Sequence, residues 1–214
     1  LDVPNLTNDE WKLVQHELKA LNVRLIYWKR PTELDISMDN AQVVLADMPC
    51  TFEAKQWQTT PVGNNEVRIF SEPKIPESLI DVGIQCGAYS RFRADSRIPE
   101  GKFEEMYRMW IEKSVQKQLA DDVLVFYSDS QVVGLITVSV ENSVGHIGLF
   151  GVDEAYRGQR IGSKLLEAAL HYFGTKNCVS VEVVTQQTNH PACRAYERAG
   201  FHVKDKQFYY HIWL

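Results

Sequence analysis

The chain has 214 residues, of which 44% are hydrophobic and 24% are charged, and its formal net charge is −5. This composition is typical of a soluble globular protein, and the negative charge argues against nucleic acid as a partner. No apolar run approaches the roughly 20 residues of a membrane-spanning helix, so we expect no membrane insertion. The cysteines form no C-x-x-C pair and the six histidines do not cluster, which indicates a reducing, cytoplasmic location and no metal site.

The first 72 residues predict a small α/β domain. Thr7 and Glu10 form a capping-box pattern, which predicts a helix with an apolar stripe that begins at Trp11. Strand-like runs follow at 23–28, 42–46 and 52–57, with turn residues at Pro31, Asp39-Asn40 and 47–49. Pro, Gly and Asn residues between 60 and 76 mark a boundary. We therefore expect a first domain at 1–72, whose residues indicate no particular chemistry, and a second domain at 73–214.

The second part of the chain alternates helical and strand patterns. Apolar residues at three- and four-residue spacing predict helices at 77–88 and 102–118. The predicted strands lie at 67–70, 122–127, 132–140, 147–152, 178–185, 201–203 and 207–214, the last two as closing antiparallel strands. With helices after 161 and 189, the order from residue 67 is β-α-α-β-β-β-α-β-α-β-β. This order predicts an α+β fold.

Residues 144–163 carry the most informative motif. A predicted strand and a polar turn lead into Arg157-Gly158-Gln159-Arg160-Ile161-Gly162, and an amphipathic helix follows. Backbone N–H groups at the start of a helix have no intrahelical partner and bind anionic oxygens. The motif therefore predicts a loop that holds a pyrophosphate. Neither a kinase-type phosphate loop nor a dinucleotide fingerprint is present. Because arginine does not readily take a positive φ, we expect Arg160 to be helical.

A second motif, NHPACRAYERAGF, follows the predicted strand at 178–185. Asn189 suits an N-cap, Pro191 suits the first turn of a helix, and Gly200 suits the residue that follows its end. Tyr196 falls on the same side of this short helix as three alanines. The sequence therefore predicts a strand followed by a helix that presents Tyr196.

The patterns [Q/R]-x-x-G-x-[G/A] at 157–162 and N-x-x-A-x-x-x-Y-x-x-x-G-F from Asn189 resemble those of the GNAT acyltransferase superfamily, except that Arg160 replaces a usual glycine. The resemblance implies a mixed, mostly antiparallel sheet, splayed between its fourth and fifth strands at 147–152 and 179–185 and flanked by helices. It implies acetyl-CoA as cofactor and a bulge flanked by Gly148 and Gly151. The implied cofactor-binding residues are Phe150, Gly151, Val152, Arg157, Gly158, Gln159, Arg160, Ile161, Gly162, Ser163, Asn189 and Tyr196.

Attack of a neutral amine on a thioester needs a donor for the oxyanion, an acid for the departing thiolate and a free amine. The resemblance implies a backbone N–H near Phe150 as the donor and Tyr196 as the general acid. Glu182 is the candidate base. The alternatives are His146, Glu141, a chain of water molecules, or an amine that needs no base. A cysteine nucleophile, Cys178 or Cys193, is a further option, although neither has a base beside it in sequence.

The segment Ser90-Arg91-Phe92-Arg93 lies between the first two helices of the second domain. Two arginines beside an aromatic ring suit a phosphorylated ligand with a planar base. With WIEKSV and TQQTNHPACRAYERAG, this segment resembles the acetyltransferases of enterobacterial common antigen synthesis that act on TDP-fucosamine, a dTDP-linked amino-dideoxy sugar. The resemblance implies that Arg91, Phe92 and Arg93 contact a nucleotide sugar used in surface polysaccharide synthesis.

Two other functions stay open on the sequence. One is a member of the superfamily that acts on another amine, such as a polyamine, an aminoglycoside or a protein N-terminus. The other is a non-catalytic module that binds acyl-CoA. The C-terminal YYHIWL segment predicts an exposed edge strand, which makes a homodimer a further expectation.

Overall fold

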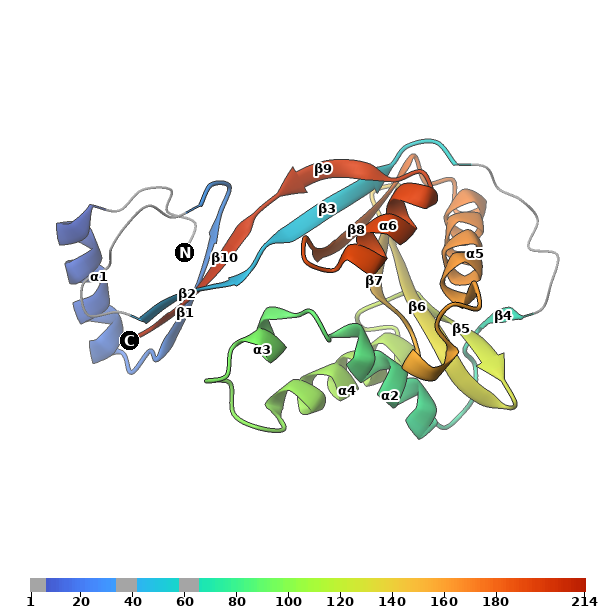
Figure 1. Ribbon diagram of the computed structural model, residues 1–214, viewed down its shortest axis with the longest axis horizontal. Helices are drawn as coiled ribbons and strands as arrows, with labels where there is room; N and C mark the ends of the chain where they lie inside the picture. The colour runs from blue at the N-terminus through green and yellow to red at the C-terminus, as the bar shows by residue number, and fades with distance from the viewer. Residues whose placement is uncertain (1–6, 34–41, 58–65) are drawn as a thin grey trace.

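The computed structural model describes residues 7–33, 42–57 and 66–214, which form two sheets with helices packed against them (Figure 1). The helices are α1 (Asn8–Ala20), α2 (Glu77–Cys86), α3 (Arg91–Ala94), α4 (Lys102–Val115), α5 (Ile161–Thr175) and α6 (His190–Arg198), with a 3₁₀ turn η1 (Glu154–Tyr156). The strands are β1 (Leu25–Arg30), β2 (Gln42–Asp47), β3 (Pro49–Ala54), β4 (Val67–Ile69), β5 (Asp122–Ser128), β6 (Gln131–Glu141), β7 (Val144–Val152), β8 (Ser180–Gln186), β9 (His202–Lys206) and β10 (Phe208–Trp213). The sequence located these elements within a few residues, except for the short helix α3. The turn at 39–40 and residues 60–65 of the boundary segment 60–76 lie outside the described residues.

The smaller sheet has the order β1-β10-β2 and packs one face on α1. The predicted capping box of α1 is confirmed, because Glu10 N–H donates to Thr7 Oγ1 at 3.4 Å and Thr7 N–H donates to Glu10 Oε2 at 2.8 Å. The rings of Trp11 and Trp28 stack at 6.1 Å in the core between helix and sheet. Burial of these large rings holds α1 in place.

The larger sheet has the order β4-β5-β6-β7-β8-β3-β9. Among its described strands only β7 and β8 pair in parallel, and the other neighbours are antiparallel, as the resemblance implied. Helices α2 and α4 cover one face, while α5 and α6 cover the other (Figure 1). The apolar stripe of α5, with Leu165, Ala169 and Phe173 fully buried, supplies much of the core on its side.

Strand pairing crosses the predicted boundary at residue 72. Strand β3 lies between β8 and β9 in the larger sheet, and β10 lies between β1 and β2 in the smaller one. Only Met48 separates β2 from β3, and only Gln207 separates β9 from β10, so the two strand pairs form one ribbon that belongs to both sheets. At the crossing, Gln207 N–H donates to Pro49 O at 2.9 Å. The division into 1–72 and 73–214 stays a prediction about folding units.

Two expectations for the C-terminus are wrong. The last two strands do not close one sheet together, since β9 pairs with β3 and β10 joins the smaller sheet. The YYHIWL segment is not an edge, because β10 has a partner on each side. A strand-like sequence carries no information about which strands pair with it.

Candidate active site

Strands β7 and β8 separate halfway along their length. They pair only from Val144 opposite Ser180 to Ile147 opposite Val183. Beyond that point β7 continues against β6 and β8 continues against β3, so the edges that the two strands turn toward each other have no strand partner among the described residues. The implied splay is therefore present, and it leaves backbone groups that can pair with an extended ligand.

A β-bulge in β7 begins where the strands separate. Gly148 and Leu149 of β7 stand opposite the single residue Thr137 of β6, and Leu149 N–H donates to Thr137 Oγ1 at 2.8 Å. A Cβ at Gly148 would lie 2.6 Å from the same oxygen, so this position requires glycine. The implied bulge is confirmed, and a bulge bends the strand that contains it.

The turn from η1 into α5 contains the predicted pyrophosphate loop. Gly158 has a φ of 82° and Arg160 a φ of 61°. The expectation that Arg160 is helical is wrong, because it is the left-handed N-cap of α5. The chain reverses direction at this residue to enter the helix, and a left-handed residue provides that reversal at a cost of about 1–2 kcal/mol for an arginine.

The first turn of α5 has backbone donors without helical acceptors. Helical bonding begins with Lys164 N–H, which donates to Arg160 O at 3.1 Å. The N–H groups of Ile161, Gly162 and Ser163 precede that bond and have no acceptor within the helix. These groups lie at the positive end of the helix dipole, which suits an anion such as a pyrophosphate.

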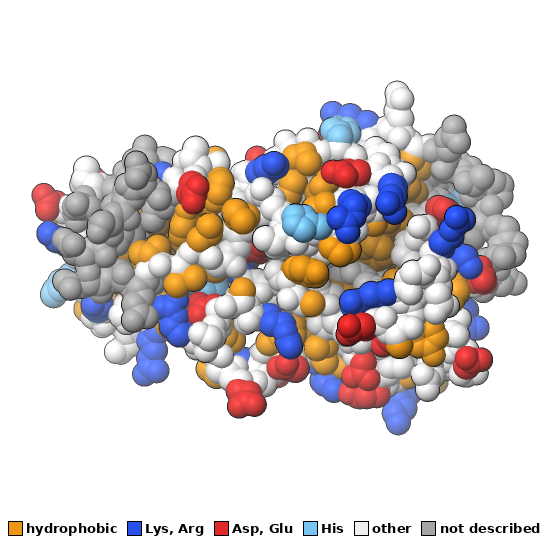
Figure 2. Space-filling view, in the orientation of Figure 1, with side chains coloured by type: hydrophobic (Ala, Val, Ile, Leu, Met, Phe, Trp, Pro, Cys, Tyr) orange, Lys and Arg blue, Asp and Glu red, His pale blue; other side chains and the backbone are white. Residues whose placement is uncertain are grey.

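Basic side chains gather on the face of the molecule formed by α6 and the N-terminal half of α5 (Figure 2). Arg194 and Arg198 are exposed on α6, and Arg157 and Arg160 are exposed in the turn that precedes α5. Arg157 Nε donates to Val152 O at 3.2 Å, which fixes the start of the loop against the end of β7. Although the chain is acidic as a whole, this face therefore suits a ligand with several phosphates.

Asn189 connects α6 to the end of β8. Its Oδ1 accepts from Ala192 N–H at 3.3 Å, and its Nδ2 donates to Thr185 Oγ1 at 3.2 Å. Pro191 lies in the first turn and Gly200, with a φ of 89°, follows the end of the helix, so the predicted cap and ending are both confirmed. Because the oxygen and nitrogen of this side chain each have a protein partner, Asn189 holds α6 beside the opening.

Tyr196 is buried among aromatic rings, with 3% of its surface exposed. The rings are those of Phe52, Phe150 and Phe201, whose centroids lie 5.6, 5.9 and 5.8 Å from that of Tyr196. Burial, with smaller contributions from two nearby cysteines, raises the pKa of Tyr196 well above its ordinary value. No hydrogen bond to its hydroxyl is found within the described part of the chain. The phenol therefore stays protonated and has its proton free to donate.

A cavity of about 300 Å³ lies between α2, α3 and α4 on one side and α6 with the separated ends of β7 and β8 on the other. Its lining residues are Asp47, Cys86, Ser90, Arg91, Phe92, Tyr107, Trp110, Gly148, Leu149, Phe150, Val184, Thr185, Gln186, Asn189, Ala192 and Tyr196. Both strands contribute residues that follow their last shared pair. The opening between the strands therefore leads into the cavity, whose volume suits part of a small ligand.

The backbone of Phe150 faces Cys86 across the cavity wall. Cys86 lies at the end of α2, its Sγ donates to Val82 O at 3.2 Å, and a Cβ at Gly151 would lie 2.6 Å from that sulfur. Burial raises the pKa of Cys86 to about 12, and a backbone hydrogen bond from Phe150 acts in the opposite direction. Cys86 and Phe150 both line the cavity, on the α2 side and the β7 side.

Of the three predicted substrate residues, Arg91 and Phe92 line the cavity and Arg93 does not. The Arg91 guanidinium carbon lies 5.4, 4.5 and 4.9 Å from the ring centroids of Tyr27, Phe92 and Tyr209. Its Nε is buried and has no hydrogen bond within the described part of the protein. Arg93 instead pairs with Glu104 at 3.5 Å, outside the cavity. Three rings thus hold Arg91 as a fixed positive charge.

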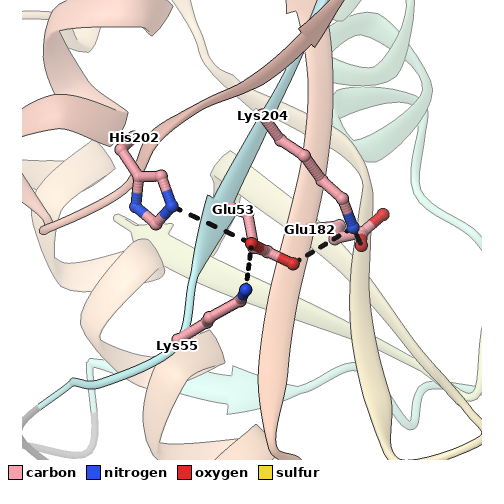
Figure 3. A network of polar contacts seen from close by, with 5 residues as sticks. All are labelled: Glu53, Lys55, Glu182, His202 and Lys204. Carbon is pink, nitrogen blue, oxygen red and sulfur yellow. Dashed lines mark hydrogen bonds and ion pairs between the residues drawn. The ribbon is translucent and has the colours of Figure 1, made fainter.

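Glu182 belongs to a network of charged side chains outside the cavity (Figure 3). Lys204 of β9 binds Glu182 and also Glu53 of β3, the latter at 3.1 Å. Lys55 and His202 approach Glu53 from its other side at 3.3 and 3.8 Å. Glu182 therefore faces Lys204 and not the cavity, and the network ties β8, β3 and β9 together.

The other candidate bases and nucleophiles do not line the cavity either. His146 stands opposite Glu182 in the pairing of β7 with β8, and Glu141 ends β6. Burial raises the pKa of both Cys178 and Cys193, which keeps these thiols protonated and weakly nucleophilic. Within the described residues, no cluster of His, Cys, Asp or Glu could hold a metal ion, and no helix has the length and apolar character needed to cross a membrane.

Sequence reasoning missed Asp47, which the ribbon of β2 and β3 brings into the cavity wall. Tyr107 was not predicted to contact a ligand, and Trp110 entered only through the resemblance of the WIEKSV segment, whereas both residues line the cavity. No motif surrounds Asp47, and its position depends on the pairing of β2 with β10. The aromatic stripe of α4 is the signal that could have indicated Tyr107.

Residues 89–201 match the sequence model of the Acetyltransferase (GNAT) family. The spore coat polysaccharide biosynthesis protein SpsD of Bacillus subtilis (strain 168) is 25% identical to the chain over 142 residues, which cover 66% of this chain and 49% of SpsD. Mycothiol acetyltransferase of Corynebacterium glutamicum (strain R) is 31% identical over 101 residues, which cover 44% of this chain and 35% of that protein. The chain thus spans half or less of the length of these curated relatives.

Among solved structures, a conserved protein of unknown function from Staphylococcus epidermidis ATCC 12228 has the same fold. It superposes with a TM-score of 0.62 and 18% sequence identity, over 98% of this chain and 81% of that one. The likeness extends over nearly the whole chain, so it includes the smaller sheet as well as the segment that matches the family.

Proposed function

Because the chain belongs to the acetyltransferase (GNAT) family, we propose that it transfers an acetyl group from acetyl-CoA, the donor used by this family, to a primary amine. The observation that carries this proposal is the opening between β7 and β8, which leads into a cavity lined by the protonated phenol of Tyr196. The residues around the opening fit such a donor in three respects, which concern its phosphates, its extended arm and its thioester.

The loop before α5 would hold the pyrophosphate. Its donors are the N–H groups of Ile161, Gly162 and Ser163, with Gly158 and Gln159 in the turn that precedes them. Arg157 and Arg160 are exposed beside these donors and would add positive charge. A helix N-terminus with nearby arginines binds phosphate groups by hydrogen bonds and by charge.

The separated edge of β7 would hold the pantetheine arm. Phe150, Gly151 and Val152 follow the last pair with β8, and their backbone groups can bind amides as an added strand would. Asn189 would act by fixing α6 beside this edge. When bound, acetyl-CoA supplies the activated acetyl group and the thiol that leaves.

Two groups of the chain would assist the transfer. The Phe150 N–H would stabilise the negative charge that develops on the acetyl oxygen, as an oxyanion donor does. Tyr196 would give its proton to the departing sulfur. The raised pKa of Tyr196 suits an acid that must stay protonated until the carbon–sulfur bond breaks. Glu182, bound to Lys204, is a poor candidate for the base.

We infer further that the acceptor is the amino group of a dTDP-linked amino-dideoxy sugar. Arg91 presents a fixed positive charge at the cavity, and the rings of Phe92 and Trp110 lie 6.4 Å apart beside it. A guanidinium suits the phosphates of such a ligand and an aromatic ring suits its base. The similarity to SpsD, a spore coat polysaccharide biosynthesis protein by name, supports a role in polysaccharide synthesis.

A different small amine is the alternative acceptor, and the similarity to mycothiol acetyltransferase favours it. A polyamine fits less well, because the described lining contains Arg91 as a positive charge and Asp47 as its one carboxylate. A module that only binds acyl-CoA needs no buried phenol at the opening. Measured turnover of acetyl-CoA with an amine distinguishes acetyl transfer from binding of acyl-CoA alone.

The test is the release of free CoA thiol from acetyl-CoA in the presence of dTDP-4-amino-4,6-dideoxygalactose, with spermidine and a free amino sugar as comparison amines. The proposal predicts rapid release with the nucleotide sugar and slow release with the other two. Equal rates with all three amines would contradict the nucleotide-sugar assignment. Tight acetyl-CoA binding without thiol release on any amine would overturn acetyl transfer itself.

A further inference from the structure

Asp47 brings a carboxylate from the smaller sheet into the cavity of the larger one. It ends β2, where it stands opposite Tyr209 of β10, and it lines the cavity together with Tyr196 and Arg91. The other described side chains of the lining include no carboxylate. An acceptor that enters this cavity therefore meets one negative and one positive side chain, from β2 and α3.

The carboxylate of Asp47 is held in place without being neutralised. Gln186 Nε2 of β8 donates to its Oδ2 at 3.3 Å, and the backbone of Met48 gives it a further hydrogen bond. Arg91 of α3 and His211 of β10 act on it electrostatically, but no ion pair to Asp47 occurs within the described ranges. A carboxylate has about four acceptor positions, so these two hydrogen bonds leave acceptor capacity for a ligand.

The surroundings of Asp47 favour a cationic ligand or a proton. Burial raises the pKa of Asp47, and the hydrogen bond from Gln186 and the charges of Arg91 and His211 only partly offset this effect. A half-buried carboxylate without an ion-pair partner gains most from a cation that enters beside it. At neutral pH, an aliphatic amine arrives as such a cation, and it must lose a proton before it can attack a thioester.

We propose that Asp47 binds the protonated amine of the acceptor and removes its proton. This inference rests on the proposed acetyl transfer. The acceptor nitrogen first passes one proton to an Asp47 oxygen, and Asp47 later releases this proton to water. The nitrogen then forms a bond to the acetyl carbon as the carbon–sulfur bond breaks. Tyr196 gives its proton to the sulfur and regains one when the nitrogen loses its second proton. The sum is an amide, a thiol and one released proton.

The charges in the cavity also restrict the acceptor. Asp47 attracts an amine, while Arg91 attracts an anion and repels a second cation. The geometry therefore matches an acceptor that carries an amino group and an anionic group in one molecule. Amino-sugar nucleotides have this character and polyamines do not.

The experiment compares Asp47→Asn with the wild type, using acetyl-CoA and dTDP-4-amino-4,6-dideoxygalactose over a range of pH. Asn keeps an oxygen that accepts from Gln186, so the link between β2 and β8 persists. We expect kcat/KM for the nucleotide sugar to fall by about 10²–10³-fold at pH 7, the scale of a lost general base. The dissociation constant of acetyl-CoA should change by less than about twofold, since Asp47 lies away from the phosphate loop.

The pH profile separates catalysis from a structural role. The activity of Asp47→Asn should rise about tenfold per pH unit as free amine replaces the protonated form, whereas the wild type should level off at lower pH. Asp47→Glu, which restores the carboxylate, should recover part of the activity. Asp81→Asn, a change of an exposed acid on α2, is the matched control and should behave as the wild type.

Three outcomes overturn the inference. If Asp47→Asn keeps the wild-type kcat/KM, Asp47 has no role and acetyl transfer stands. If its activity falls by the same factor at every pH and Asp47→Glu restores nothing, Asp47 is structural. If the wild type itself turns over no amine, acetyl transfer is wrong and the role of Asp47 falls with it. If Asp47→Asn does not fold, the pH profile of the activity of Asp47→Glu tests the inference instead. A base with a displaced carboxylate must change the pH at which the rate levels off, and an unchanged profile would overturn the inference.

Discussion

The rings of Tyr196 and Phe150 lie 5.9 Å apart, with 44° between their planes. This contact joins α6 to β7 beyond the point at which β7 has separated from β8. Packing between two aromatic side chains therefore fixes the distance between the proposed acid and the proposed oxyanion donor, where no backbone pairing does so. Buried ring contacts of this kind are specific in geometry and contribute about 0.5–1.5 kcal/mol beyond their burial.

Tyr196→Phe tests the acid, because it keeps the ring contacts and removes only the hydroxyl. We expect kcat to fall by about 10²-fold while the dissociation constant of acetyl-CoA stays within about twofold. Stability should change little, since the hydroxyl lines the cavity and its removal breaks no hydrogen bond between described residues. Steady-state kinetics, calorimetry of acetyl-CoA binding and urea unfolding measure the three quantities.

Tyr172→Phe is the matched control for that change. The Tyr172 hydroxyl donates to Asp122 at 2.9 Å and does not line the cavity. Its loss should reduce stability by about 1–2 kcal/mol and leave kcat unchanged. Equal kcat values for the two variants would contradict the acid role of Tyr196.

The pH dependence of kcat has an expected direction on its alkaline side. An acid works only while it is protonated, and burial raises the pKa of Tyr196 above the ordinary phenol value of about 10. The wild-type rate should therefore show no decline that is due to Tyr196 up to about pH 10. A decline in rate that begins near pH 8 and is absent in Tyr196→Phe would contradict the raised pKa of Tyr196.

Arg91→Ala tests the acceptor side of the cavity. We expect KM for the nucleotide sugar to rise by about tenfold or more, with little change in KM for acetyl-CoA, because the guanidinium that would bind phosphate is removed. Arg93→Ala is the control, since Arg93 pairs with Glu104 away from the cavity. If both variants raise both KM values equally, the acceptor does not bind at Arg91.

Alanine substitutions at Gly158 and Gly162 test the conformation of the loop before α5. Gly158→Ala reports on backbone strain, and Gly162→Ala reports on helix propensity. Gly158 has a φ of 82°, and a Cβ there would meet no described atom within 4 Å, so alanine should cost about 1 kcal/mol in conformation alone. Gly162 is helical, and a Cβ there would make only ordinary contact with Phe150, at 3.4 Å. Alanine at that position should leave stability unchanged or raise it by up to about 1 kcal/mol. Urea unfolding of the two variants checks this difference.

Asp95→Asn tests how the smaller sheet is attached. Burial alone would raise the pKa of Asp95, but hydrogen bonds from His211, Trp213 and Arg97 outweigh it and lower the pKa well below its usual range. A carboxylate with a lowered pKa stabilises the fold above its unfolded-state pKa of about 3.9, and this contribution is lost as the pH falls toward the folded value.

We therefore expect the wild type to lose stability steadily below about pH 5. At pH 7, Asp95→Asn should be destabilised by roughly 2–4 kcal/mol, because the partners of Asp95 lose the buried charge that they bind. On acidification, the variant should lose less stability than the wild type. Urea unfolding at pH 7 and pH 4 measures both effects, with Asp81→Asn as the exposed control. Parallel pH profiles for the wild type and Asp95→Asn would contradict this role.

The sequence predicted well what depends on neighbours along the chain. The cap at Asn189 and the order of elements after residue 67 both follow from local patterns of turn residues and apolar spacing. The bulge at Gly148 was implied by the resemblance. The splay between β7 and β8 came from the resemblance, and the motifs at 157–162 and from Asn189 carried it.

The sequence could not predict what depends on strand partners. An alternating pattern fixes the face of a strand and not its neighbour, so the insertion of β3 beside β8 and the place of β10 were missed. For the same reason Glu182 was proposed as a base, although Lys204 from β9 neutralises it, and Asp47 was overlooked. The left-handed Arg160 was missed because residue preference disfavours that conformation, while the entry into α5 imposes it.

The most direct test of the central claim is the crystal structure of the protein bound to acetyl-CoA. We expect the pantetheine arm between the separated ends of β7 and β8, the pyrophosphate on the N–H groups of Ile161, Gly162 and Ser163, and the sulfur beside the Tyr196 hydroxyl. Binding of acetyl-CoA at any other surface, with the opening between the two strands left vacant, would contradict it.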